Sequence, residues 1–238
     1  RADDATFLRR VYLDLVGTIP TWEEALAFLD DAASDKRSKL IDKLLDDPRY
    51  AQHQADEWDM VYFGRNPPGY DAEKRTGFQK WLQEQFARNT PYDQLARSIL
   101  KAEGNTAEQG APMFLVQFSN HPEDATVKIT QTFLGVQLQC ARCHDHPYED
   151  WTQLDFYGMA AFLARLQTVS AGEANKQKKI FVGEKNTGEI NFTGPAKEDE
   201  PGKKGTPVSP KFLLGEQLVE PPVDEKQKDE RLPDGKEP

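Results

Sequence analysis

Apolar residues recur at helical spacing through the first two-thirds of the chain. The first such segment places on one face Phe7, Leu8, Val11 and Leu15. Gly17 is positioned to end this helix, because glycine readily takes the left-handed conformation that follows many helices. Thr21 and Glu24 then have the spacing of a capping box, which predicts that a second, short helix runs through Leu29.

The same spacing continues along the next part of the chain. A third helix is expected to end at Pro48, and a fourth spans about 50–63 before the sequence RNPPGYD interrupts it. Helical spacing resumes at 78–86. It returns after Pro91, which suits the first position of a further helix.

Two more helices are predicted on either side of the two cysteines. Pro122 is expected to open a long helix over 122–139 that reaches the cysteines. Its buried stripe would consist of Ala125, Ile129, Phe133 and Val136. Thr152 is placed to cap the last helix, with Asp155 three residues further on.

After about Leu166 the character of the chain changes. The stretch at 178–192 predicts two short strands around an Asn-Thr-Gly turn. The rest is rich in Pro, Gly, Lys and Glu, which indicates an extended arm that is ordered only where it docks, with one apolar island at 212–214. We therefore predict a mainly α protein, with a helical domain at 1–166, a hairpin extension at 167–193 and a linker or docking arm at 194–238.

Charge and composition exclude two classes of partner. The formal net charge is −10, so the phosphate backbone of a nucleic acid would be repelled, whereas a basic protein would be attracted. No apolar run approaches the roughly 20 residues that a membrane span needs. The chain begins at Arg1 without a methionine, so we expect it to be processed or truncated, and its lack of a signal segment then excludes no compartment.

Both cysteines and two of the four histidines lie in the short segment CARCHDHP. Such a pair admits a redox dithiol, half of a zinc site, a local disulfide or a c-type haem attachment. The helical context does not suit a redox dithiol, and a disulfide across so short a loop would contribute little. A zinc site built on Cys140, Cys143 and His146 would need a fourth ligand. That ligand would have to be His53 or His121, neither of which belongs to a second paired motif.

The haem signature, Cys-x-x-Cys-His, matches Cys140, Cys143 and His144. In such sites the two thiols add across the porphyrin vinyl groups, and their spacing places both sulfurs along one edge of the ring. The histidine, fixed directly after the second thioether, points its imidazole at the iron. We therefore expect one covalent haem c, with His144 as the proximal iron ligand.

The stretch FLGVQLQCARCHDHPYEDWTQLDFYGMAAFLAR, which contains this motif, resembles the planctomycete cytochrome-c-like domain family. That family is named for its Cys-x-x-Cys-His motif and has no established function. The opening block RADDATFLRRVYLDLVGTIPTWEEALAFL is similar to the family's N-terminal block, and DDPRYAQHQADEWDMVYFG and NTPYDQLARSIL resemble further blocks. The resemblance covers about residues 1–166 and implies a helical, c-type cytochrome-like domain. Only Cys140, Cys143 and His144 carry over from it with a role.

The resemblance also implies a cellular context. PKFLLGEQ resembles the connector that leads, in such proteins, to a C-terminal domain missing from this chain. Members of the family look like large exported proteins of bacteria rich in extracellular carbohydrate-degrading enzymes. We therefore expect a periplasmic or extracellular protein whose partners are a redox protein and a C-terminal domain of the same polypeptide.

The residue on the second face of the iron would decide the chemistry. His146 starts on the same side of the porphyrin as His144, so a contact around the site or simple packing is expected for it. His53, on the predicted fourth helix, is preferred to His121 as the distal ligand. A straight helix over 122–139 would hold His121 about 27 Å from the motif, unless the chain folds back.

Other side chains near the motif are expected to serve the core. Met113 and Met159 are the usual alternative type of iron ligand, but their apolar surroundings indicate core positions. Four aromatic residues crowd the region after the motif and could line a haem crevice, although aromatic residues at helical spacing are more often plain core. They are Tyr148, Trp151, Phe156 and Tyr157.

The expected function is one-electron transfer by an exported cytochrome domain. A second hypothesis is a haem-dependent oxidoreductase whose iron has an open sixth position and acts with peroxide or oxygen. Its link to extracellular carbohydrate breakdown rests only on the carbohydrate-degrading enzymes of the bacteria in which the family occurs. A third is a non-catalytic module in which the haem only holds a scaffold together. The sequence shows no nucleophile triad and no phosphate-binding glycine loop. Whether the protein is an enzyme therefore depends on the sixth position of the iron.

Overall fold

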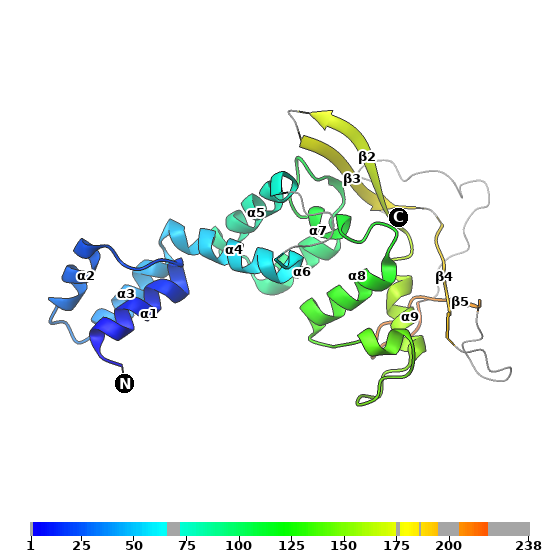
Figure 1. Cartoon of the computed structure of the whole chain (residues 1–238), viewed down its shortest axis with the longest axis horizontal. Helices are drawn as coiled ribbons and strands as arrows, with labels where there is room; N and C mark the ends of the chain where they lie inside the picture. Colours follow the sequence, from blue (N-terminus) through cyan, green and yellow to red (C-terminus); the bar gives the residue numbers. More distant parts are fainter. Residues whose placement is uncertain (1, 66–71, 175–176, 186, 195–204, 219–238) are drawn as a thin grey trace. The chain divides into compact units, whose positions relative to one another are not determined.

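The structure, a computed structural model, describes residues 2–65, 72–174, 177–185, 187–194 and 205–218 (Figure 1). The chain divides into two compact units, Arg1–Arg97 and Ser98–Pro238. Helices make up most of the regular secondary structure, and a small antiparallel sheet accompanies them, which confirms the mainly α expectation at this level. The division falls inside the helical domain predicted for 1–166, and the predicted domain limits stay predictions. None of the described helices is both long and apolar enough to cross a bilayer.

The first unit is helical. Its elements are α1 (Asp4–Val16), α2 (Trp22–Leu29), α3 (Lys36–Leu45), α4 (Pro48–Phe63), α5 (Ala72–Ala87) and the start of α6 (Tyr92–Leu100), which continues into the second unit. The predicted capping box of α2 is present: Glu24 N–H donates to Thr21 Oγ1 (3.2 Å), and Thr21 N–H donates to Glu24 Oε2 (2.8 Å). α4 begins slightly earlier than predicted, at Pro48, because proline fits the first helical position and Asp47 accepts the N–H of Arg49 (2.9 Å).

α1, α2 and α3 share a small apolar core. Its buried members are Leu8, Val11, Tyr12, Val16, Phe28, Leu40 and Leu44. As predicted, α1 ends at Gly17, which takes a left-handed conformation with φ of 71°. His53 of α4 occupies the space beside this glycine, since a Cβ on Gly17 would lie 2.5 Å from His53 Nδ1.

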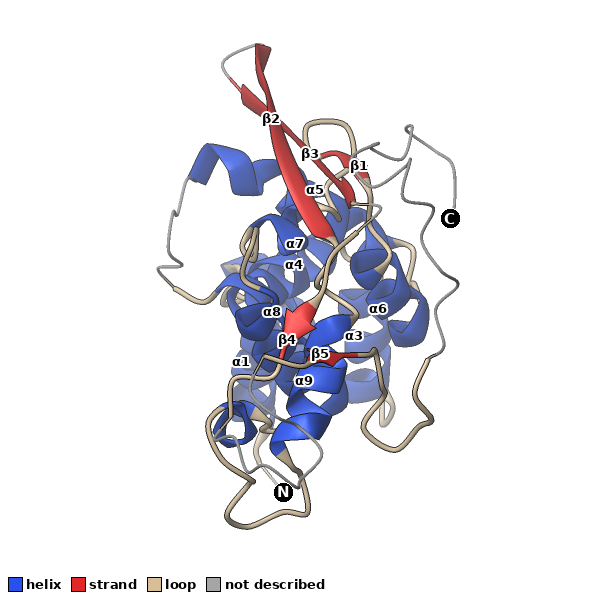
Figure 2. Cartoon of the chain, turned by 90° about the vertical axis from the view of Figure 1, so that its right-hand side faces the viewer, coloured by secondary structure: helices blue, strands red, loops and turns tan. Residues whose placement is uncertain are grey.

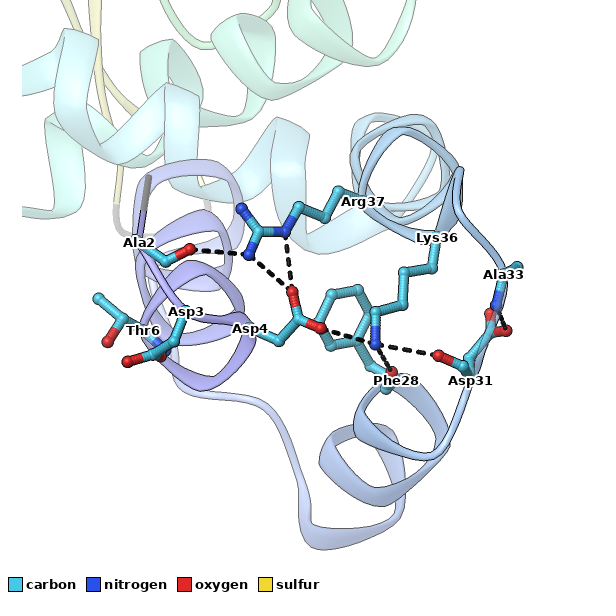
Figure 3. Close-up of polar contacts among 9 residues, drawn as sticks. All are labelled: Ala2, Asp3, Asp4, Thr6, Phe28, Asp31, Ala33, Lys36 and Arg37. Atoms are coloured by element: carbon cyan, nitrogen blue, oxygen red, sulfur yellow. Dashed lines mark hydrogen bonds and ion pairs between the residues drawn. The ribbon is translucent and has the colours of Figure 1, made fainter.

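An ion-pair network connects α1 with α3 and the end of α2 (Figure 3). The Asp4 carboxylate accepts from Lys36 Nζ (2.8 Å) and Arg37 Nη2 (2.6 Å), and these two bonds lower the pKa of Asp4. Lys36 Nζ also donates to the carbonyl of Phe28 (3.3 Å) and lies over its ring, 4.9 Å from the centroid. Because partly exposed ion pairs contribute little stability, we infer that the network mainly sets how α1, α2 and α3 are oriented.

α4 and α5 pack through edge-to-face aromatic contacts. The Phe78 ring, fully buried, meets Tyr62 (5.7 Å between centroids) and Phe63 (5.0 Å) at steep angles of 85° and 78°. Such geometry is the preferred one for aromatic pairs, so these rings fill the interface without strain.

The second unit combines short helices with a small sheet. After α6 its elements are β1 (Gly104–Asn105), α7 (Met113–Val116), α8 (Pro122–Ile129), the π-helical turn η1 (Thr130–Leu134), the 3-10 helix η2 (Gln139–Arg142), α9 (Gln153–Ala161), β2 (Leu166–Ala174), β3 (Gln177–Glu184), β4 (Ile190–Asn191) and β5 (Pro207–Val208). The sheet is antiparallel with strand order β1-β3-β2, and β4 pairs separately with β5. The β4–β5 pair lies against α9 (Figure 2).

The helix predicted over 122–139 is wrong in its length. α8 ends at Ile129, η1 follows, and Gly135 ends this turn in a left-handed conformation with φ of 68°. The hydroxyls of Thr126 and Thr130 donate to carbonyls four residues earlier (2.8 and 2.9 Å), a pattern that bends helices. The apolar stripe continued past the glycine and hid this end from the sequence analysis.

The hairpin is present but lies earlier in the chain than predicted. β3 contains the first predicted strand, yet it pairs with the preceding β2, from Leu166↔Glu184 to Ala174↔Gln177. The Asn-Thr-Gly turn was therefore the wrong turn; it follows β3, and Asn186 lies outside the described residues. β2 was missed because its sequence, LQTVSAGEA, shows only weak alternation of apolar and polar positions.

The arm docks on α9. Lys211 Nζ pairs with Asp155 Oδ1 (3.0 Å), and the Lys211 N–H donates to the carbonyl of Gly158 (3.0 Å). Gly158 permits this approach, since a Cβ there would lie 3.0 Å from the Lys211 Cβ and 3.3 Å from its carbonyl oxygen. Lys211 therefore brings the arm into direct contact with the helix.

Two residues of the apolar island take part in this docking. The Phe212 ring stacks on Phe162 with 4.4 Å between centroids, and Leu213 packs against the buried cluster around α9. The buried members of this cluster are Leu138, Ala141, Phe156, Tyr157, Met159, Ala160, Ala161, Ile190 and Phe192. Leu214 is 93% exposed and does not contribute.

The contact between Gly17 and His53 generates a testable prediction. Gly17→Ala and Gly135→Ala should each lower the free energy of unfolding by about 1 kcal/mol, because both glycines are left-handed, with φ of 71° and 68°. Gly17→Ala should cost about 1–3 kcal/mol more, because its Cβ meets the His53 ring whereas nothing lies within 4 Å of the position at Gly135. Denaturant unfolding followed by circular dichroism measures the difference.

The double variant Gly17→Ala/His53→Ala isolates the cause. It should recover most of the additional loss relative to His53→Ala alone. Equal losses of unfolding free energy in the two glycine variants would show that the His53 ring moves aside without a free-energy cost.

Candidate cysteine and histidine site

The segment carrying the two cysteines alternates between core and surface. Leu138 and Ala141 are fully buried and belong to the apolar cluster around α9. Cys140 and Cys143 are exposed free thiols, and His144 is also exposed. Because the two buried residues fix η2 against α9, the segment presents both thiols and the imidazole to solvent.

Side chains of α9 hold the backbone of this segment. The carbonyl of Arg142, between the two cysteines, accepts Tyr157 Oη (3.3 Å) and Gln153 Nε2 (3.4 Å). Asp145 Oδ1 accepts the N–H of Gln153, the first residue of α9 (2.9 Å). Tyr157 is 2% exposed, so its bond is shielded from competing water. The motif and the start of α9 therefore form one hydrogen-bonded structure.

The ring of His144 has a defined proton position. Its Nδ1 lies 2.7 Å from the carbonyl oxygen of Asp145. A carbonyl oxygen only accepts, so Nδ1 carries the proton and donates it. Nε2 of the neutral ring then keeps its lone pair and can bind a metal, while the bond at Nδ1 orients the ring.

His146 has the opposite arrangement. Its Nδ1 accepts the backbone N–H groups of Tyr148 (3.3 Å) and Glu149 (3.0 Å). The backbone N–H of His146 donates to the carbonyl of Trp151 (2.7 Å). In the neutral ring the proton is then on Nε2, which has no lone pair to offer a metal. His146 therefore closes the loop before α9, in line with the packing role expected for it.

A pocket of about 400 Å³ adjoins Cys143. It is lined by Asp124, Val127, Gln139, Arg142 and Cys143. Arg142 Nη1 donates to Asp124 Oδ1 (2.8 Å), which brings the motif back against the start of α8.

This return of the chain changes the position of His121. His121 Nδ1 lies 4.0 Å from Asp124 Oδ2, and its side chain is 68% exposed. The expectation that a straight helix would hold His121 about 27 Å from the motif is therefore wrong, because α8 is short and Arg142 bonds to Asp124.

The other predicted iron ligands lie elsewhere. His53 is half-buried in the first unit, where its ring packs beside Gly17. Its role as a distal ligand stays a prediction. Met113 and Met159 are buried core residues, as expected, and Met60 is 41% exposed on α4.

The four aromatic residues after the motif divide into two kinds. Phe156 and Tyr157 are buried in the α9 cluster and meet edge-on with 5.3 Å between centroids, so they are core. Trp151 packs partly buried against the same cluster. Tyr148 is 90% exposed and cannot belong to the core.

Several contacts of the site were missed by the sequence analysis. Asp124 and Arg142 are 18 positions apart, and Tyr157 and Gln153 reach back to Arg142 across 15 and 11 positions. No local pattern encodes such contacts. The one available signal was the arginine between the cysteines, whose charge required a partner.

The competing interpretations of the cysteines differ in how they fit these contacts. Within the described part of the chain, no three His, Cys, Asp or Glu side chains gather as a metal-binding group. The described residues thus hold no preformed zinc site. Both cysteines are free thiols, so no disulfide joins them in this structure.

The charge at the start of α9 is also set by these contacts. Asp155 completes the predicted capping box: Thr152 N–H donates to Asp155 Oδ2 (2.9 Å), and Asp155 N–H donates to Thr152 Oγ1 (3.2 Å). Burial by itself would raise the pKa of Asp155. The bonds from Thr152 and Lys211 outweigh burial, and the pKa lies below its ordinary value.

The fold and the site define a mainly helical protein with an exposed Cys-x-x-Cys-His segment supported by one helix. A family model described as PSCyt2, protein of unknown function (DUF1549), matches residues 1–168. The match covers more than half of the chain, which therefore belongs to this family. No curated protein and no solved structure matches the chain.

The lowered pKa of Asp155 predicts a pH dependence. The carboxylate stabilises the folded protein above its ordinary pKa of 3.8, and this contribution is lost as the pH falls through the lower folded pKa. Asp155→Asn should therefore lower the free energy of unfolding by about 1 kcal/mol near pH 7, and the difference from wild type should shrink below about pH 4.

Urea unfolding at several pH values measures this effect. Glu103→Gln is the control, because Glu103 is exposed in the same unit and outside any helix. A difference between Asp155→Asn and wild type that stays constant down to pH 2 would show that the charge of Asp155 is not involved.

Proposed function

We propose that this chain is an exported c-type cytochrome domain that binds one haem covalently and transfers single electrons. The observation that carries the proposal is the state of the motif: Cys140 and Cys143 are exposed free thiols, and His144 directs its Nδ1 proton to a carbonyl. That combination leaves two sulfurs and one imidazole lone pair available on a single anchored segment.

Each residue of the motif has a role in this proposal. The Cys140 and Cys143 thiols would each add S–H across a vinyl C=C bond, which forms a thioether and requires no oxidant. His144 Nε2 would bind the iron, and the Asp145 carbonyl, which accepts from Nδ1 at 2.7 Å, would hold the ring in its orientation.

When bound, the haem supplies a one-electron couple whose potential depends on its axial ligands and exposure to solvent. The residues of this chain would bind and orient it. Attachment residues at the surface suit exchange of electrons with a second protein. The buried contacts of Leu138, Ala141 and Tyr157 with the cluster and backbone would keep the attachment site rigid.

The second axial position separates electron transfer from oxidoreductase chemistry. His121 is supported as its occupant by its neighbour Asp124, which bonds to Arg142 within the motif. His121 is also 68% exposed and 4.0 Å from its charged neighbour, so it is weakly held. That weak attachment favours, as a second candidate, a haem-dependent oxidoreductase with an open sixth position.

Location and partners follow from the same proposal. Covalent haem attachment of this type takes place outside the cytoplasm, so the protein would be periplasmic or extracellular. Its partners would be a redox protein and a C-terminal domain of the same polypeptide, which the connector-like sequence PKFLLGEQ supports.

Covalent attachment predicts a change of mass. Intact protein isolated from a host with cytochrome c maturation, and measured under denaturing conditions, should have the mass of the polypeptide plus one haem. Cys140→Ser/Cys143→Ser should have the bare polypeptide mass, because no thioether can form. A bare wild-type mass together with stoichiometric zinc would contradict the proposal and favour the zinc interpretation.

The second axial ligand predicts a spectroscopic difference between two histidine variants. His121→Ala should convert a low-spin absorption spectrum to a high-spin one while the haem stays attached. His53→Ala, the matched variant in the first unit, should leave the low-spin spectrum unchanged.

The reverse result would assign the distal position to His53, as the sequence analysis expected. A high-spin wild-type spectrum would exclude both histidines. Binding of cyanide or peroxide to such a protein would then favour the oxidoreductase.

A further inference from the structure

α2 exposes an apolar face to solvent. Trp22 is 73% exposed, Leu26 39% and Leu29 43%. These residues follow the spacing i, i+4, i+7 and therefore lie on one side of the helix. All four tryptophans of the chain belong to the described part, and Trp22 is the exposed one.

A different side of α2 attaches the helix to the unit. Phe28 is 7% exposed in the core shared with α1 and α3, and its ring and carbonyl both contact Lys36 (Figure 3). The capping box of Thr21 and Glu24 fixes the first turn. The exposed face of α2 is thus not the one that holds the helix in place, and it is already ordered.

Such a face is typical of a binding surface. Tryptophan is rarely exposed to this extent, and it is enriched among the residues that carry most of the binding energy of interfaces. A partner that binds an ordered helix pays little conformational entropy. The spacing of the three residues matches the way a helix lies in an apolar groove.

The charges around the face indicate the chemistry of the partner. The segment 19–35 contains no lysine or arginine, and its carboxylates are Glu23, Glu24, Asp30, Asp31 and Asp35. Glu24 pairs with Arg49 (2.9 Å) and Asp35 with Lys39 (3.0 Å), so the negative charge of the border rests on the other three. The nearest cations in sequence, Lys36 and Arg37, are both paired with Asp4. A second copy of this chain or an anionic membrane would therefore meet like charge, and a basic surface would be attracted.

We propose that the face formed by Trp22, Leu26 and Leu29 docks onto an apolar face of a protein partner, and that lysine or arginine residues border this partner face. The inference is independent of the proposed haem. It assigns the first unit a role in assembly.

A model peptide tests the proposal. The probe is a fluorescein-labelled, 14-residue amphipathic peptide of leucine and lysine, and its binding to the intact chain is measured by fluorescence anisotropy. Wild type should bind with a saturable isotherm that weakens as salt is added. Trp22→Ser/Leu26→Ser should bind about ten-fold more weakly or worse, because it loses two central apolar contacts.

A matched variant controls for general loss of apolar surface. Ile41→Ser/Leu45→Ser removes two exposed apolar side chains (36% and 44%) from α3 and should bind like wild type. Glu23→Lys/Asp30→Lys keeps the apolar face, reverses its charged border and should also bind more weakly. Far-UV circular dichroism checks that each variant is folded.

Four results would overturn the proposal. They are absence of saturable binding by wild type, equal loss in the α2 and α3 serine variants, equal binding of a leucine–glutamate peptide, and binding of wild type to phosphatidylglycerol vesicles. A dimer in sedimentation that Trp22→Ser/Leu26→Ser converts to a monomer would assign the face to a second copy instead.

Discussion

The second unit depends on the first turn of α9. Thr152 and Asp155 satisfy each other's backbone N–H groups there, and Lys211 of the arm adds its charge to Asp155. The next residue, Gln153, donates its N–H to Asp145 in the loop that follows the cysteines. One helix terminus therefore connects the arm, the core and the motif, because its unpaired N–H groups find acceptors in Thr152 and Asp145, and the Asp155 carboxylate accepts from Lys211 of the arm.

α9 supports the cysteine segment without burying its reactive side chains. Its buried face packs against Leu138 and Ala141, and its polar side chains bind the carbonyl of Arg142. What remains at the surface is the reactive part of the segment, Cys140, Cys143 and His144. A site arranged in this way can accept a large planar group without removing anything from the core, which suits the proposed haem attachment.

Sequence was sufficient where structure depends on near neighbours and insufficient where it depends on distant ones. The caps at Thr21 and Thr152 were predictable because the bonding groups lie three residues apart. Gly135 was visible too, but a helical stripe continued beyond it and gave no warning of the turn. The pairing of β2 with β3 and the bond from Arg142 to Asp124 depend on how the chain returns on itself, which periodicity does not record.

The separation along the chain of Asp155 and Lys211, 56 positions, has a consequence for the order of folding. Contacts between distant positions close late, after local helices have formed. During synthesis both cysteines precede the arm, so they emerge while α9 still lacks its last partner. A reaction of the thiols that needs a loosely held loop can take place before the arm docks against Gly158.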